Sequence, residues 1–223
     1  FVRHHVAHAA SSGLATPCGD GSVLVLYGRG EATSMLAGEY WEGKLDILAA
    51  QSLPHSLGLA YEELTEHLGF VRSSDEYKVM ALASYGVPRF ADRLRERIFF
   101  VDGGYRTLPI DWTEFAPRRT DSDSTTVRSE HADLAASVQR VVEEVVLDLA
   151  RWLHGRTGAD VLTLAGGLAL NCVANTRVHC ESPFRTVWVQ PAAGDAGTAL
   201  GAALTVAAES GDVVEPMQTA ALG

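Results

Sequence analysis

The chain opens with FVRHHVAHAASSG, in which His4 and His8 stand four residues apart. On a helix this spacing projects both imidazole rings from one face, which is workable geometry for two ligands of an iron, manganese or zinc ion. Histidines on a helix surface or within a core can have the same spacing, so the two residues alone leave both interpretations open. The sequence has no HExxH motif, which argues against a zinc protease.

A third candidate ligand lies far along the chain, in the segment QPAAGDAGTALGAA. Asp195 stands there between two glycines, where an expected strand passes into an expected helix. Its carboxylate could cap the N-terminus of that helix. It could equally be a hard oxygen ligand for a metal ion.

A glycine-rich turn in VLTLAGGLALNCVAN suits a nucleotide ligand. An apolar strand runs into Gly166 and Gly167, and the helix that follows offers free N–H groups to a phosphate or to the sugar of a nucleotide. Asn171, one turn further on, could hydrogen-bond a ribose or a base. The alternative is a tight strand-to-helix turn without a ligand, because such turns are common.

Two other segments carry charged residues beside expected turns or helix starts. In LYGRGE, a turn formed by Gly28, Arg29 and Gly30 could hold phosphates, or it could be a hairpin turn only. In DEYKVMALASYG, Glu76 and Lys78 begin an expected helix, where acidic residues are ordinary. Lys78 would suit a phosphate if that helix faced the ligand.

The elements that must position these residues alternate between strands and helices. An antiparallel meander is expected over 22–50 and an exposed loop or lid over 101–128. Hydrophobic periodicity predicts helices over 4–12, 56–68, 75–84, 88–98, 130–154, 168–178 and 196–208. Strands are expected at 161–164 and 186–189. The pattern predicts an α/β protein with ligand loops at the carboxyl ends of its strands.

Composition narrows the class of protein. The chain has 223 residues, of which 47% are hydrophobic and 21% charged, as in a globular protein of one large domain or two small lobes. Its net charge of −10 argues against charge-driven binding of nucleic acid. Three cysteines without a CxxC pair favour a reduced, cytoplasmic setting. No apolar run approaches the roughly 20 residues of a membrane-spanning helix, so no membrane partner is expected.

Six segments together resemble one family, in the same order and over nearly the whole chain. They are HHVAHAAS, YGRGE, SLPHSLGLAYEELTEHLGF, DEYKVMALASYG, LAGGLALNCVAN and VQPAAGDAGTALGAAL. The family is that of the O-carbamoyltransferases that modify antibiotics and nodulation factors. The resemblance implies an α/β domain of the actin, sugar-kinase and Hsp70 type, with ribonuclease-H-like lobes. Residues 1–223 would then hold most of two lobes, about 1–100 and about 129–223, with 101–128 as a loop or lid.

The resemblance also implies an activity. In the family, carbamoyl phosphate and ATP yield carbamoyl-adenylate in a separate downstream domain, and the domain resembled here transfers the carbamoyl group to a hydroxyl of a small-molecule acceptor. The chain lacks an initiator Met, and we expect it to be a fragment without its N-terminal strands and downstream domain. A sugar-kinase-like phosphotransferase and a degenerate nucleotide-binding scaffold remain as alternatives.

Site residues follow from the resemblance position by position. It implies that His4, His8 and Asp195 bind a divalent metal, iron or manganese. His5 is a candidate general base by proximity only. Contacts with the nucleotide are implied for Gly28, Arg29, Gly30, Glu76, Lys78, Gly166, Gly167 and Asn171.

One position departs from the family pattern. Where the family has an aspartate ligand in a DGxGE segment, this chain has Tyr27 in LYGRGE. Tyrosine is a poor substitute for a carboxylate at neutral pH, since its unperturbed pKa is about 10. A water, a nucleotide phosphate or Tyr27 as a phenolate could fill the position, or the site could be weakened or empty.

Overall fold

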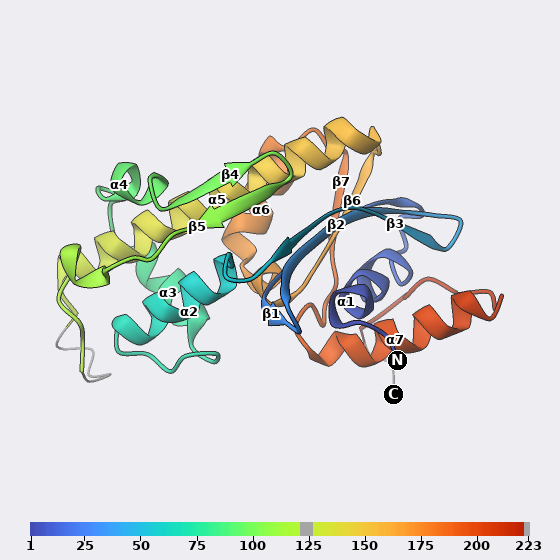
Figure 1. The fold of residues 1–223 in the computed structure, drawn as a ribbon, viewed down its shortest axis with the longest axis horizontal. Helices are drawn as coiled ribbons and strands as arrows, with labels where there is room; N and C mark the ends of the chain where they lie inside the picture. The colour runs from blue at the N-terminus through green and yellow to red at the C-terminus, as the bar shows by residue number, and fades with distance from the viewer. Residues whose placement is uncertain (121–126, 221–223) are drawn as a thin grey trace.

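The computed structural model describes residues 1–120 and 127–220, and a five-stranded sheet organises them (Figure 1). The strand order is β3-β2-β1-β6-β7. The strands are β1 (Gly21–Gly30), β2 (Thr33–Trp41), β3 (Lys44–Ser52), β6 (Val161–Ala165) and β7 (Thr186–Val189). The first three pair antiparallel, whereas β1 pairs parallel with β6 and β6 parallel with β7. The carboxyl ends of β1, β6 and β7 therefore meet at one edge of the sheet.

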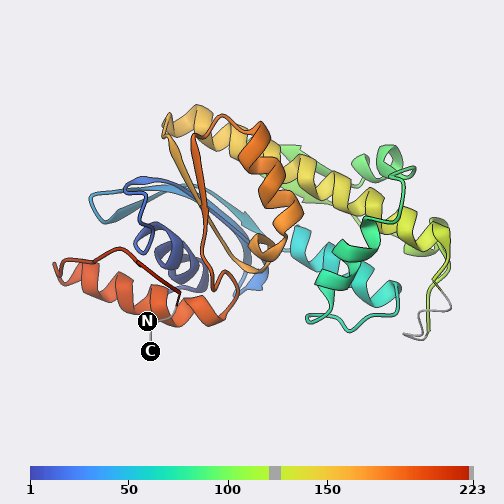
Figure 2. The ribbon, with the colours of Figure 1, turned by 180° about the vertical axis from the view of Figure 1, so that it is seen from behind.

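A helix of small residues covers one face of this sheet, and a second such helix packs against the first. They are α1 (His4–Gly13) and α7 (Ala196–Glu209), which lie against each other in both views (Figures 1 and 2). Gly201 permits the close approach, because a Cβ built there would lie 1.8 Å from the carbonyl oxygen of Ala7. The start of α7 is thereby held beside the first turn of α1.

The other face of the sheet carries the larger core. It packs against α5 (Ser129–Thr157), α6 (Cys172–Glu181) and a hairpin of β4 (Ile98–Val101) and β5 (Gly104–Thr107) (Figure 2). The apolar stripe of α5 is buried along most of its length, and the helix ends at Gly158 with a φ of 65°. A left-handed glycine at that place is an ordinary helix terminator.

A group of shorter helices extends beyond the sheet along the N-terminal half of α5 (Figure 1). It contains α2 (Leu57–His67), α3 (Glu76–Ala83), α4 (Ala91–Arg95) and the 3-10 turn η1 (Trp112–Glu114). The loop after α3 is fastened to α5, because the backbone N–H of Val87 donates to Asp133 at 2.7 Å and that of Phe90 donates to Ser137 at 3.0 Å. These bonds fix α3 relative to α5.

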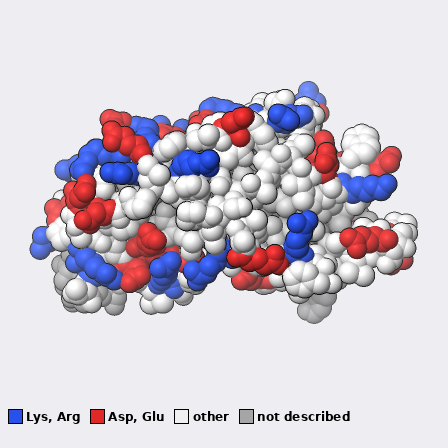
Figure 3. All heavy atoms as spheres, in the orientation of Figure 1, with Lys and Arg blue, Asp and Glu red and all other residues white. Residues whose placement is uncertain are grey.

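Charges of both signs are interspersed on the face shown in Figure 3. Ion pairs form between several charged side chains of the protein, including Arg72 with Glu62 at 3.0 Å and Arg95 with Glu144 at 2.8 Å. No helix among the described residues is both long enough and apolar enough to cross a membrane.

The mixed α/β class predicted from the sequence is confirmed, but several local predictions are wrong, two of them away from the candidate site. The helix expected over 88–98 is helical only in α4, and Ile98 begins strand β4. Ile98 and Tyr105 are fully buried, β4 packs against α5, and the Asp102–Gly103 turn between β4 and β5 has positive φ at both residues. Tertiary packing and a tight turn therefore replace the predicted charged helix with a hairpin.

The second correction concerns the segment 101–128, which is not one exposed loop. It contains β5 and η1, while the expectation for 121–126 lies outside the described residues. The five-stranded sheet also takes strands from both predicted lobes, so the boundaries near 100 and 129 do not coincide with an edge of the sheet. The division into lobes stays a prediction.

Candidate functional site

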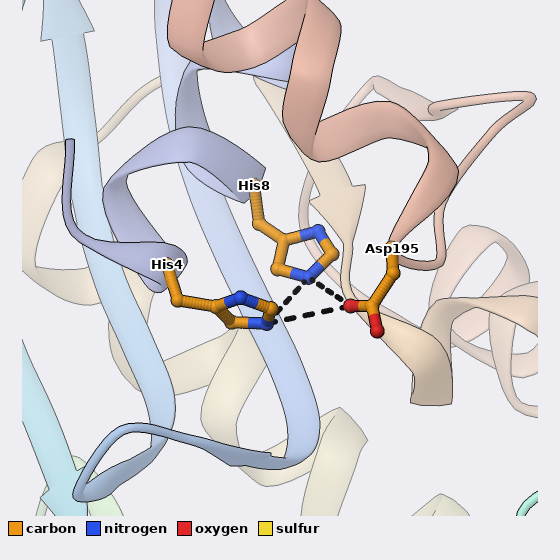
Figure 4. Close-up of side chains that lie close together, drawn as sticks. All are labelled: His4, His8 and Asp195. Carbon is orange, nitrogen blue, oxygen red and sulfur yellow. Dashed lines mark hydrogen bonds and ion pairs between the residues drawn. The ribbon is translucent and has the colours of Figure 1, made fainter. Parts of the chain in front are cut away.

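His4, His8 and Asp195, here called the metal triad, meet at the carboxyl edge of the sheet (Figure 4). The Nε2 atoms of the two histidines are 3.1 Å apart. Asp195 Oδ1 lies 3.5 Å from Nε2 of His4 and 3.6 Å from Nε2 of His8. Ligand atoms bonded at about 2.1 Å to one ion are about 3.0 Å apart in octahedral and about 3.4 Å apart in tetrahedral geometry. The triad fits a divalent metal of the two-histidine, one-carboxylate kind.

Each ligand is positioned by local backbone structure. The i, i+4 spacing on α1 places the two imidazoles edge to face on one side of the helix, with ring centroids 4.6 Å apart. Gly30 makes room for the ring of His4. A Cβ at Gly30 would lie 2.2 Å from the ring of His4. Asp195 is the N-cap residue of α7, but its side chain makes no capping hydrogen bond. The carboxylate is thus directed to the histidines rather than to the helix backbone.

Protonation also favours cation binding at the triad. Burial, followed by the nearby His4, lowers the pKa of His8 to about 4. At neutral pH its contact with Asp195 is therefore not an ion pair, and His8 can present a lone pair from Nε2. Imidazole and carboxylate lone pairs that converge on one point form a suitable donor set for a metal ion.

Tyr27 completes the surroundings of Asp195 without joining the triad. Its hydroxyl donates to Asp195 Oδ2 at 2.7 Å, the oxygen turned away from the histidines. Burial first, and the Asp195 carboxylate second, raise the pKa of Tyr27 well above its usual value. Both effects keep Tyr27 a neutral phenol, which orients the carboxylate as outer-sphere donors do in metal sites.

His5 points away from this cluster. Only 4% of it is exposed, its Nδ1 lies 2.9 Å from the hydroxyl of Thr33, and burial lowers its pKa to about 4. Its ring packs beneath Gly30. It does not line the cavity beside the triad, so the role of His5 as a general base stays a prediction.

A cavity of about 310 Å³ opens beside Asp195. Four of the predicted nucleotide residues line it: Gly28, Glu76, Gly167 and Asn171. Its walls come from the carboxyl end of β1, from α2 and α3, and from the 3-10 turn η3 (Gly167–Leu170). Helix α2 comes close to β1 because a Cβ at Gly58 would lie only 2.6 Å from Cα of Gly28.

The other predicted nucleotide residues lie outside the cavity lining. Arg29 is exposed, and Lys78 pairs with Asp75 at 2.9 Å. Gly166, with a φ of 91°, allows η3 to approach β1, since a Cβ there would lie 2.2 Å from the carbonyl oxygen of Leu26. The sequence also placed a turn at residues 28–30. These residues instead end β1, past an irregularity in its pairing with β2, and the chain reverses at 31–32.

Two polar residues that the sequence did not single out, Tyr61 and Gln139, are connected to the cavity lining. Tyr61 and Asn171 belong to that lining and are here called the cavity floor, and Gln139 lies behind them. Tyr61 donates its hydroxyl to Gln139 at 2.9 Å. Gln139 is hydrogen-bonded in turn to Asn171, the N-cap residue of α6. A glutamine within the apolar stripe of a long helix was the only sequence signal for this arrangement. The helix expected over 168–178 is also divided, because Asn171 separates η3 from α6.

Comparison with known proteins gives a consistent set of relatives. The family model of the carbamoyltransferase N-terminus matches residues 1–204. The uncharacterized protein sll1178 of Synechocystis is 41% identical, over 92% of this chain and 36% of its own length. Nodulation protein NolNO of Sinorhizobium fredii is 37% identical, over 95% of this chain and 32% of its own length. The chain spans about a third of the length of these curated relatives.

Among solved structures, the crystal structure of T. kodakarensis HypF aligns with 98% of this chain and 38% of its own. The TM-score is 0.45 and the sequence identity is 18%.

Proposed function

The chain belongs to the family of carbamoyltransferase N-terminal domains, and from that premise we propose that it transfers a carbamoyl group from carbamoyl-adenylate to a hydroxyl of a small-molecule acceptor. Carbamoyl phosphate and ATP would supply the donor in a further domain of the full-length protein. One observation carries the proposal: Asp195 belongs both to the metal triad and to the lining of the 310 Å³ cavity. A nucleotide in that cavity would have its phosphates beside the triad.

The residues of the chain would bind and orient the nucleotide. The backbone at Gly28 and Gly167 would approach it closely, and Glu76 would face the ribose. A divalent ion held by the triad, iron or manganese, would supply Lewis acidity and neutralise phosphate charge. Asp195 would share its two oxygens between the triad and Tyr27, so the carboxylate keeps one orientation.

The proposed step is an acyl transfer. The acceptor oxygen forms a bond to the carbamoyl carbon, and the bond between that carbon and the phosphate oxygen of AMP breaks. AMP leaves with the electron pair, and the hydroxyl proton passes to a base or to water. The buried position of His5 gives it no direct path to that proton, so we assign the base to no described residue.

The family's further ligand position is the main departure, and the geometry suggests how it is filled. Because the Tyr27 hydroxyl is engaged by Asp195 Oδ2, Tyr27 would act as an outer-sphere donor rather than as a phenolate ligand. A phosphate oxygen or a water would then occupy the open coordination position. We further propose that the sheet and its covering helices form a ribonuclease-H-like lobe, and that the enzyme works in the cytoplasm.

Product analysis on the full-length protein tests this function. With ATP, Mn²⁺ and an acceptor hydroxyl, or water in its place, we expect AMP to form only when carbamoyl phosphate is present. ADP formation independent of carbamoyl phosphate would support a sugar-kinase-like phosphotransferase instead. Neither product, together with no heat on titration with ATP, would support a scaffold domain.

Variants of the triad test the metal. His4→Ala and His8→Ala should lose both bound metal, measured by elemental analysis, and carbamoyl phosphate-dependent AMP formation. His179→Ala, which removes an exposed histidine from α6, is the matched control and should change neither. Unchanged metal content in both triad variants would overturn the metal assignment.

A further inference from the structure

The floor of the cavity is built on a buried pair of amide side chains. Gln139 on α5 is 4% exposed and Asn171 at the start of α6 is 8% exposed. Asn171 Nδ2 donates to Gln139 Oε1 at 2.9 Å, and Gln139 Nε2 donates to Asn171 Oδ1 at 3.1 Å. The reciprocal pair joins α5 to the start of α6, and Asn171 belongs to the cavity lining.

Gln139 uses its whole hydrogen-bonding capacity. Its Oε1 also accepts from the Tyr61 hydroxyl at 2.9 Å, and its Nε2 also donates to Glu143 Oε1 at 2.8 Å, one turn along α5. A primary amide has two donors and two acceptor lone pairs, so all four are satisfied. Each of the three partners comes from a buried position, which makes this a closed polar network.

The direction of every bond in the network is fixed by its two ends. An amide's nitrogen and oxygen have the same shape, so their placement follows from their partners. The Glu143 carboxylate is an acceptor and requires the nitrogen of Gln139 on its side. At the other end the backbone N–H of Ala174 donates to Asn171 Oδ1 at 3.1 Å and requires the oxygen there. Gln139 and Asn171 are therefore both held against flipping.

The fixed direction decides what the cavity floor offers to a ligand. Tyr61 must donate its proton to Gln139, which leaves the lone pairs of its hydroxyl oxygen. Burial and the carboxylates of Glu143 and Glu76 raise the pKa of Tyr61, so it keeps that proton. Asn171 retains a second N–H, for which the described residues provide no acceptor. Tyr61 and Asn171 both line the cavity, so we infer that this lone pair and this N–H are the acceptor and the donor available to a ligand.

We propose that Gln139 is a positioning residue that makes the site select adenine over guanine nucleotides, an inference that rests on the proposed nucleotide-dependent function. Adenine presents an acceptor, N7, beside a donor, its N6 amino group, whereas guanine presents two acceptors, N7 and O6. One donor and one acceptor at the floor complement adenine. With guanine, an acceptor would meet the Tyr61 oxygen, whose proton is held by Gln139.

The remaining wall suits the flat faces of a heterocycle. Met80, Leu168 and Leu170 line the same cavity, together with Tyr77 of α3. Leu170 is 60% exposed, as is Tyr77, although both are large and apolar or aromatic. Such side chains at a cavity wall offer stacking surface to a base. The apolar wall and the polar cavity floor are therefore both suited to the base of a nucleotide.

Calorimetric titration of the full-length protein with ATP and with GTP, both with Mn²⁺, tests the proposal. The unsubstituted protein should bind ATP at least about tenfold more tightly than GTP, the discrimination expected of a matched pair of hydrogen bonds. Gln139→Met keeps a similar volume but frees the Tyr61 proton to turn toward the ligand. The ratio of ATP affinity to GTP affinity should therefore fall below about threefold. Tyr61→Phe removes the acceptor and should lower the ratio as well.

The ratio separates a positioning role from a structural one. If Gln139→Met weakened ATP and GTP equally, or if the unsubstituted protein showed no preference, the proposal would be overturned while the proposed function stood. If the unsubstituted protein bound neither nucleotide, the proposed function would fail and the inference with it. Arg140→Gln, at the next and exposed position of α5, is the control and should leave the ratio unchanged. Should Gln139→Met not fold, Tyr61→Phe decides.

Discussion

The metal triad and the polar network below the cavity use similar side chains in opposite ways. In the triad, three ligand atoms from α1 and α7 converge within 3.6 Å, and the Asp195 side chain is 63% exposed. In the network, Gln139 is buried and fully hydrogen-bonded by protein partners. The converging lone pairs of the triad are suited to binding a cation. The closed network instead fixes the positions of its own side chains and the direction of their hydrogen bonds. Stability and ligand affinity should therefore respond separately to changes in the two regions.

The largest difference between the effect on Mn²⁺ affinity and the effect on the free energy of unfolding is expected from Asp195→Asn. Loss of the carboxylate should lower Mn²⁺ affinity at least about 100-fold, because it removes the only charged ligand of the triad. The free energy of unfolding should change by less than about 0.5 kcal/mol, since the side chain is exposed and caps no helix. Calorimetric Mn²⁺ titration and urea unfolding of the metal-free protein measure the two effects. A large loss of stability would contradict the distinction.

The reverse result is expected from Gln139→Ala. It leaves Tyr61, Asn171 and Glu143 without their common partner in a buried place, and should lower the free energy of unfolding by about 3 kcal/mol. Mn²⁺ affinity should stay within about twofold, because the triad lies on other elements. A shifted urea midpoint with an unchanged metal titration would confirm the contrast, and a lost metal site would break it.

An intermediate effect on both quantities is expected from Gly201→Ala. Its added methyl group would meet the carbonyl oxygen of Ala7 and push α7 away from α1. We expect a loss of about 2 kcal/mol of stability. Mn²⁺ binding should weaken too, because Asp195 moves with α7. Gly155→Ala on α5, where a Cβ meets nothing within 4 Å, is the matched control and should not destabilise the protein.

The smallest effect on Mn²⁺ affinity is expected from a change at Tyr27, and it tests whether Tyr27 is itself a metal ligand. Tyr27→Phe removes only the hydrogen bond to Asp195 Oδ2, and should lower Mn²⁺ affinity about tenfold, as loss of an outer-sphere partner does. The Fe³⁺-loaded unsubstituted protein should show no visible tyrosinate charge-transfer band. Such a band, or a loss of affinity as large as that of Asp195→Asn, would instead make Tyr27 a ligand.

The two regions also differ in how far the sequence could predict them. His4 and His8 are one helical turn apart, and Asp195 sits in a glycine-flanked junction, so short-range patterns made all three candidates, and only the family resemblance implied them together as ligands. Their meeting depends on the contact between Gly201 and Ala7, which no local pattern encodes. Tyr61, Gln139 and Asn171 come from three helices far apart in the chain. Only the packing of α2, α5 and α6 brings them together, and this network was not predicted.

The fold shows the same limit. Strong periodicity located α5, whose apolar stripe is buried, and runs of strand-forming residues bounded by glycines located the meander of β1, β2 and β3. The segment 88–98 carries a charge pattern typical of a helix, yet the burial of Ile98 and the packing of β4 against α5 made its end a strand. Local propensity therefore failed where a distant helix supplied the deciding contact.

Helix α5 gives the molecule a mechanical property as well as a core. At 29 residues it is about 43 Å long, and it touches the sheet, the β4–β5 hairpin and α3 without interruption. The loop after α3 is hydrogen-bonded to this helix through Asp133 and Ser137. Because α3 and Gln139 are both attached to α5, any displacement of the α3 wall that moved α5 would also move the support of the cavity floor.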